Sequence, residues 1–212
     1  MKKIFYLFGI LSPILYASAV VAGDILWPSY NQMRQPISEL TADFAPKMPL
    51  VSALFNFANL CGFLFGLGLL LNSKKRSKSF KIISLLLTIA GVASLSFVFF
   101  PQDPIGAPLT FKGLVHLVLA GLASMLTIAV VFTGAYAFQS LAKMKKFSLI
   151  VGWIIVISGI LTAISTTQFP SIFGIMERIT IGTYMVWLPI LAFTLFKTNY
   201  DKLNCQKITK QS

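Results

Sequence analysis

The sequence has little charge, and acidic side chains are the scarcest of all. Only 11% of its 212 residues are charged, and only six are Asp or Glu. A soluble domain carries about 25% charged residues, so this chain lacks the polar coat that water requires. Apolar runs of roughly 20 residues, the length that crosses a bilayer, recur from end to end. The composition therefore predicts an all-α, polytopic membrane helix bundle.

Cysteine, histidine and catalytic motifs are also scarce. Cys61 lies in an apolar run and Cys205 in the basic tail, so they predict neither a disulfide framework nor a zinc site. The chain has one histidine, and no GxSxG, HExxH, CxxC or phosphate-loop motif. We therefore expect no cofactor and no metal, and the sequence favours a protein that is not an enzyme.

The apolar runs predict a six-helix transmembrane domain over residues 1–198 and a basic cytoplasmic tail over residues 199–212. The expected spans cover residues 4–23, 50–71, 82–100, 113–138, 147–166 and 172–196. The first run follows two lysines and contains Ala17-Ser18-Ala19, a pattern also typical of a cleaved signal peptide. Its length favours a retained first span.

Basic residues are distributed unevenly between the two sides of these spans. The N-terminus, the 72–81 and 139–146 loops and the chain from Lys197 onward hold 14 of the 18, leaving Arg34, Lys47, Lys112 and Arg178 for the other side. Lys and Arg near span ends favour the cytoplasm, so both termini are predicted inside. Because the basic residues flank spans and form no single basic face, the net charge of +12 does not indicate a nucleic-acid partner.

The rare acidic residues and the histidine fall mainly on the predicted outer side. Glu177 lies about one turn inside the sixth span, where an ionisable group is costly and usually faces the bundle interior. Glu177 could have a functional role, or it could form a structural ion pair with an arginine such as Arg34. His116 could handle a proton or bind a metal, or it could simply hydrogen-bond at the interface. The row below it on the same helix face is Ala120, Ala123 and Thr127.

The first outer loop contains a polar stretch, QPISELTADFAP, at residues 35–46. We expect Ser38 and Glu39 to turn inward over the bundle, and Asp43 and Lys47 to face water. The loop would then form a lid over a pocket whose floor is Glu177 and His116.

Polar and small residues within the spans indicate helix packing. Gly62 and Gly66 form a GxxxG pair near Asn59, which can hydrogen-bond across helices. Ser158 and Thr162 form part of a polar stripe that predicts hydrogen bonds between the fifth span and a neighbour. Tyr30, between the first two spans, suits an interfacial anchor.

Three motifs together resemble an uncharacterised six-span membrane family, domain of unknown function 998. They are ISELTADFAP at residues 37–46, FPQDP at residues 100–104 followed by Gly113 and His116, and GIMER at residues 174–178. The resemblance implies six helices and a bacterial-type cytoplasmic membrane. It points to Ser38, Glu39, Pro101, Asp103, His116, Glu177 and Arg178. A looser similarity to six-span families with an Ile-Ser-acidic first loop, some linked to lipid regulation, suggests lipids.

Three functions follow as hypotheses. The first is a non-enzymatic protein that binds a lipid headgroup or small amphiphile in an outer polar pocket. Its expected partners are membrane lipids and such a ligand, and the expected ligand-binding residues are Ser38, Glu39, Asp103, His116, Glu177 and Arg178. The alternatives are a membrane-embedded hydrolase that acts on lipids through carboxylates and His116, and a small proton-coupled transporter.

Overall fold

A computed structural model of the chain describes residues 3–74, 76–104 and 106–197. Six long helices and three short 3-10 helices make up its regular structure, with no strand within those ranges. The long helices are α1 (Lys3–Leu26), α2 (Met48–Leu71), α3 (Lys78–Ser96), α4 (Phe111–Ala137), α5 (Ala142–Ser165) and α6 (Phe173–Lys197), and the short ones are η1 (Ile37–Thr41), η2 (Phe97–Phe99) and η3 (Pro170–Ile172). All six long helices are apolar enough and long enough to cross a membrane, which confirms the predicted all-α bundle.

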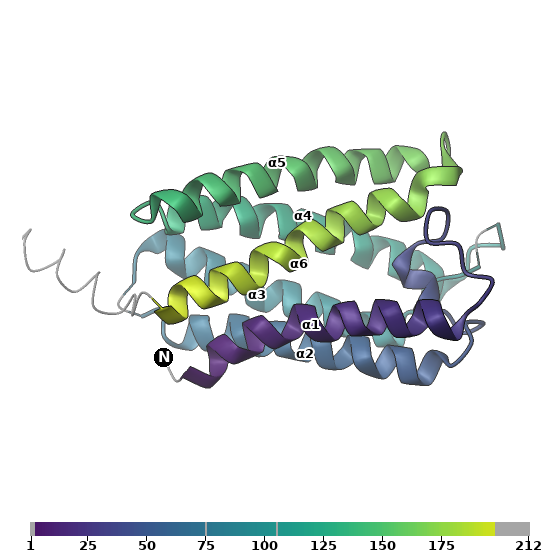
Figure 1. The fold of residues 1–212 in the computed structure, drawn as a ribbon, viewed down its shortest axis with the longest axis horizontal. Helices are drawn as coiled ribbons and strands as arrows, with labels where there is room; N and C mark the ends of the chain where they lie inside the picture. Colours follow the sequence, from purple (N-terminus) through teal and green to yellow (C-terminus); the bar gives the residue numbers. More distant parts are fainter. Residues whose placement is uncertain (1–2, 75, 105, 198–212) are drawn as a thin grey trace, which may run out of the picture.

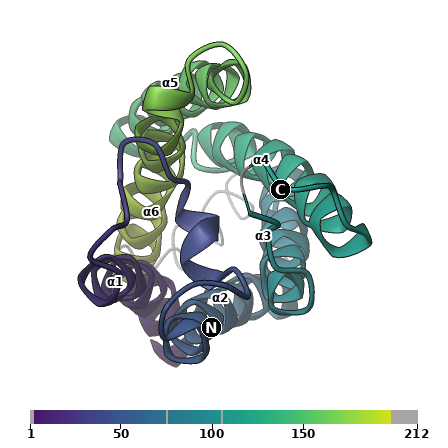
Figure 2. The same ribbon diagram turned by 90° about the vertical axis from the view of Figure 1, so that its right-hand side faces the viewer.

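The six helices form a ring in chain order. Each helix packs against the next, and α6 closes the ring against α1. Figure 1 shows the helices running side by side along the long axis, and Figure 2 looks along them and shows the ring. Large apolar side chains cover the outer surface, among them Phe57, Met125 and Trp153. In a bilayer these side chains face hydrocarbon.

The two ends of the ring differ in charge, and we name them accordingly. The acidic end holds the loop from α1 to α2, the loop from α3 to α4 and the turn before α6. It carries Glu39, Asp43, Asp103 and Glu177. The basic end holds the α2–α3 and α4–α5 connections, with Arg76 and Lys143 among its cations. The predicted tail at 199–212 lies outside the described residues.

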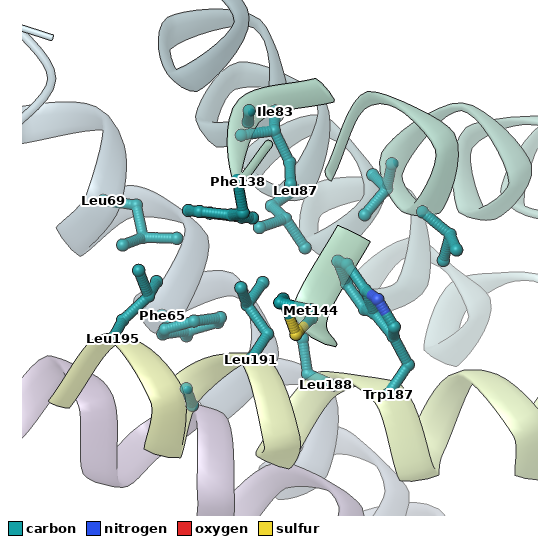
Figure 3. Close-up of a cluster of buried hydrophobic side chains, with 14 of the residues drawn as sticks. Phe65, Leu69, Ile83, Leu87, Phe138, Met144, Trp187, Leu188, Leu191 and Leu195 are labelled. Atoms are coloured by element: carbon teal, nitrogen blue, oxygen red, sulfur yellow. The ribbon is translucent and has the colours of Figure 1, made fainter. Parts of the chain in front are cut away.

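The main hydrophobic core fills the half of the ring nearer the basic end. Its side chains come from all six helices, and Figure 3 shows Phe65, Ile83, Phe138, Met144 and Trp187 meeting there. Trp187 is completely buried and its indole N–H donates to the hydroxyl of Ser148 at 2.9 Å. This bond joins α6 to α5 within the core and satisfies the one polar atom of the indole.

Close packing of α2 on α3 uses Gly66, one of the two glycines that the sequence indicated, whereas Gly62 faces Ser12 of α1. A Cβ on Gly66 would lie 2.8 Å from the backbone of Leu87 and Thr88, so only glycine fits there unchanged. The Asn59 amide donates to the Ser94 carbonyl at 3.0 Å across the same pair of helices. Both observations confirm the predicted interhelical packing.

Helix ends extend beyond most of the predicted spans, and the differences are clear at α1 and α5. Helix α1 continues past Gly23 to Leu26, and α5 begins at Ala142, before the apolar run at Phe147. The apolar run marks only the part suited to hydrocarbon, whereas the backbone hydrogen bonds of a helix continue into the polar interface.

Candidate functional site at the acidic end

Helix η1, in the loop from α1 to α2, lies in the mouth of the ring at the acidic end. Figure 2 shows it inside the circle of long helices. Its Ile37 and Leu40 are buried and pack with Ala19 of α1 and with Val51 and Phe55 of α2. A polar loop enters the bundle here because its apolar side chains form a second, smaller core.

Arg178 of α6 holds this loop through its guanidinium group. It donates to the carbonyls of Gln32 and Gln35, both at 2.8 Å, and to the hydroxyl of Tyr30. It also donates to the Gly174 carbonyl in its own helix at 3.0 Å. Because Lys carries only a point charge, this multiple contact depends on the flat, five-donor shape of Arg.

Tyr30 is part of the same contact, and it is buried where the sequence indicated an interfacial anchor. It is 8% exposed, and its hydroxyl donates to the Pro36 carbonyl at 2.8 Å. Burial raises the pKa of Tyr30 to about 12, although the nearby Arg178 charge opposes the shift. The phenol is therefore neutral at physiological pH and remains a hydrogen-bond donor. The loop folds back into the ring, so the Tyr30 side chain contacts protein on nearly all sides.

Glu177 accepts a hydrogen bond from the backbone N–H of Ile37, the first residue of η1. Its partner is thus a backbone amide of the loop, while Arg34 is exposed. Glu39, only 3% exposed, accepts from the Gln35 amide at 2.8 Å. Two carboxylates and one guanidinium therefore lie around η1, and all three are bonded to the loop.

A second polar group surrounds the start of α4. The carboxylate of Asp103 accepts from the backbone N–H and the hydroxyl of Thr110, at 2.7 and 2.8 Å. Gly113 lies against this carboxylate, where any Cβ would overlap it. His116 is 5% exposed, and its Nδ1 lies 2.8 Å from the Phe100 carbonyl. Since a carbonyl only accepts, Nδ1 carries a proton, and in the neutral ring Nε2 keeps its lone pair.

The two groups are linked by the Ser38 hydroxyl, which donates to the Gln102 side chain. The inward turn of Ser38 and Glu39 and the exposure of Asp43 and Lys47 agree with expectation. The expected pocket, with the first loop as a lid and with Glu177 and His116 together as its floor, is not found. Glu177 and His116 join different hydrogen-bond groups, and Ser38 donates to Gln102 and not to His116.

A cleft of about 560 Å³ lies between the two outer loops and the start of α4. Asp43 and Phe44 of the first loop line one part of it, and Gln102 and Asp103 of the second loop line another. Lys112 and the exposed ring of Phe111 complete it from α4. Of the six expected ligand-binding residues, Asp103 lines this cleft and Ser38 contacts its wall through Gln102.

Sequence reasoning missed several residues of this region. Gln102 lies within the FPQDP motif, so its position beside Pro101 and Asp103 could have identified it. Gln35 opens the polar stretch of the first loop, but nothing in the sequence shows that its carbonyl meets Arg178. Within the described ranges, no three His, Cys, Asp or Glu side chains gather in a way that could hold a metal ion.

Six membrane-length helices, a charged loop folded into one end and an apolar surface define a multi-pass helical membrane protein. The chain belongs to the family described as "Protein of unknown function (DUF998)", whose model matches residues 10–194. Comparisons with curated proteins and with solved structures gave no match.

Proposed function

We propose that this protein is a non-enzymatic membrane protein that binds a lipid headgroup or small amphiphile in the cleft at its acidic end. In this proposal the acidic end faces out of the cytoplasm, in a bacterial-type cytoplasmic membrane. The observation that carries the proposal is the cleft of about 560 Å³ with charges of both signs and exposed aromatic rings. Its volume lies within the roughly 300–1,000 Å³ that small-ligand sites occupy.

The charges of the cleft suit a headgroup that is both cationic and anionic. Asp43 is exposed, so its carboxylate is available to an ammonium group. The rings of Phe44 and Phe111 offer faces to the same cation. Lys112 provides a donor for a phosphate or carboxylate. Asp103 is bonded to Thr110, so it contributes charge and shapes the cleft wall.

The buried group around η1 supports this assignment by fixing one wall of the cleft. Glu177 and Arg178 hold the loop that carries Asp43 and Phe44, and the Ser38–Gln102 bond ties that loop to the opposite wall. A preformed cleft binds more tightly because less ordering is required on binding.

Native mass spectrometry of the full chain in mild detergent tests the proposal. The probe is a vesicle-derived zwitterionic phospholipid, added to protein washed free of lipid. Lys112→Gln and Asp43→Asn should each reduce the bound fraction several-fold with unchanged thermal stability, because both side chains are exposed. Lys47→Gln, in the same loop but outside the cleft, is the matched control and should bind as the unaltered chain does. Equal binding by all four proteins, or no specific adduct in any, overturns the proposal.

A further inference from the structure

A second, smaller cavity lies inside the ring, between the main core and the core around η1. Its volume is about 50 Å³. Polar side chains from five different helices line it, namely Ser12, Asn59, Ser94, Thr127 and Tyr184. It is separate from the outer cleft, since the two share no lining residue. The row below His116 therefore faces the interior, because Ala123 and Thr127 both contribute to this lining.

The hydroxyl groups at this cavity differ from most others in the helices. Ser84, Thr88 and Thr162 each donate to a carbonyl one turn earlier, which is the usual arrangement in a membrane helix. By contrast, among the residues that the structure describes, the hydroxyls of Ser12, Thr127 and Tyr184 have no hydrogen-bond partner. The Ser94 hydroxyl is equally without one, and Asn59 uses only its amide N–H, so its carbonyl oxygen accepts nothing.

Two further features add to the polarity of the cavity. The Tyr184 ring stacks on Trp187, with centroids 6.0 Å apart and planes tilted by 22°, which fixes the direction of its hydroxyl. Pro189 has no N–H, so the helical bond to the carbonyl of Met185, a lining residue, cannot form. Donors and one or more acceptors thus converge on one small space.

Unpaired polar groups in the hydrocarbon region cost several kcal/mol each, so a fold that gathers them must satisfy them. We propose that this cavity is a binding site for a small, uncharged, oxygen-bearing group. That group is either one or two water molecules or the hydroxyl or carbonyl end of a membrane amphiphile. The site goes beyond the outer cleft and does not depend on it.

Size and charge restrict the occupant. The cavity exceeds the roughly 10–15 Å³ that a single water requires, and a water occupies roughly 30 Å³ in the liquid, so one or two waters fit, or one polar group of the same size. No Asp, Glu, Lys, Arg or His lines the cavity, so nothing there would balance a charged ligand. Hydroxyls both donate and accept, which suits an oxygen that does the same.

Radiolytic hydroxyl-radical footprinting of the full chain in detergent tests the site without altering the protein. Radicals form from water at the side chain that they oxidise, and sulfur reacts readily. Met185 and Tyr184 line the cavity, whereas Met125 lies 72% exposed on the lipid-facing surface and serves as the internal control. We expect Met185 and Tyr184 to be oxidised several-fold faster than Met125 in at least one of two preparations. The first is the protein as purified, and the second is the protein after bound amphiphiles have been washed out.

The oxidation rates of Met185 and Tyr184 in the two preparations distinguish the two possible occupants, water and an amphiphile. Fast oxidation in the protein as purified identifies water. Slow oxidation that becomes fast after washing identifies the polar end of an amphiphile. Oxidation as slow as that of Met125 in both preparations means a dry cavity and overturns the proposal.

Variants that each remove one hydroxyl group from the cavity provide a second test of the proposal. Thr127→Val and Tyr184→Phe should each reduce Met185 oxidation several-fold by removing partners of the bound oxygen. Thr88→Val is the matched control, because its hydroxyl already donates to the Ser84 carbonyl and does not line the cavity. Equal Met185 oxidation in all three variants would also overturn the proposal.

Discussion

Arg178 lies next to Glu177, yet its described hydrogen bonds go to carbonyls and to a tyrosine hydroxyl. The guanidinium donates to Gln32, Gln35, Gly174 and Tyr30, and it lies over the Tyr30 ring at 5.4 Å. Only its Nε, which is buried, lacks a partner within the described chain. The residue therefore acts as a backbone clamp on the first loop, a role that its charge alone does not indicate.

Replacing this guanidinium should destabilise the protein even when the charge is kept. Arg178→Lys removes guanidinium donors from the Gln32 and Gln35 carbonyls, at a total cost of about 1–3 kcal/mol. We expect a clear fall in the thermal unfolding midpoint, measured by the intrinsic fluorescence of the purified protein in detergent. Arg34→Lys, at an exposed position of the same loop, should change the midpoint little. A midpoint for Arg178→Lys equal to that of Arg34→Lys would contradict the clamp.

The polar residues show how far single-residue reasoning reaches. Scarcity alone identified Glu39, Asp103, His116 and Glu177, because an ionisable side chain in so apolar a chain requires a partner. It could not identify the partners. Those are mostly backbone groups, such as the Ile37 N–H and the Phe100 carbonyl. Every residue has such groups, so they leave no pattern in the sequence.

Among the elements, helix η1 depends on α6 for its position. Gly174, at the start of α6, touches the backbone of the loop, and a Cβ there would overlap the carbonyl oxygens of Gln32 and Gln35. The long helices were predicted closely because a bilayer demands apolar runs of fixed length. The η1 segment was expected only as a lid, since its burial depends on contacts made far along the chain.

A methyl group at Gly174 should displace the loop from the ring. We expect Gly174→Ala to increase amide hydrogen exchange over residues 31–41, measured by mass spectrometry. Gly182→Ala is the matched control on the same helix, because nothing lies within 4 Å of the Cβ that it adds. Exchange that is equally slow in both variants would show that α6 does not hold the loop.

For the molecule as a whole, α1 is an integral part of the ring. It packs on both α2 and α6, and Ala19, fully buried, belongs to the small core around η1. Because removal of this helix would open the ring, we predict that the first span is retained. The intact mass of protein purified from cells should match the full 23.3 kDa chain. A smaller mass, equal to that of a chain beginning just after Ala19, would instead identify a cleaved signal peptide.

The orientation of the ring in the membrane is a second prediction at this scale. The basic end should face the cytoplasm, because Lys and Arg concentrate there. In a background of Cys61→Ala and Cys205→Ala, Arg34→Cys should react with a membrane-impermeant maleimide on intact cells. Lys143→Cys should react only after the cells are permeabilised. Both side chains replaced are exposed, so the labelling reports the side of the membrane. The reverse pattern would invert the proposed topology.

The bond between Ile37 and Glu177 joins residues 140 positions apart, and this has a consequence for biosynthesis. A ribosome delivers the helices to the membrane in order, so the first loop emerges long before the helix that anchors it. Until α6 has been inserted, the loop lacks Glu177 and Arg178, and α1 lacks one of its two neighbours in the ring. A nascent chain that stops short of α6 would therefore expose an unanchored loop, a form that quality-control proteases can distinguish from the finished protein.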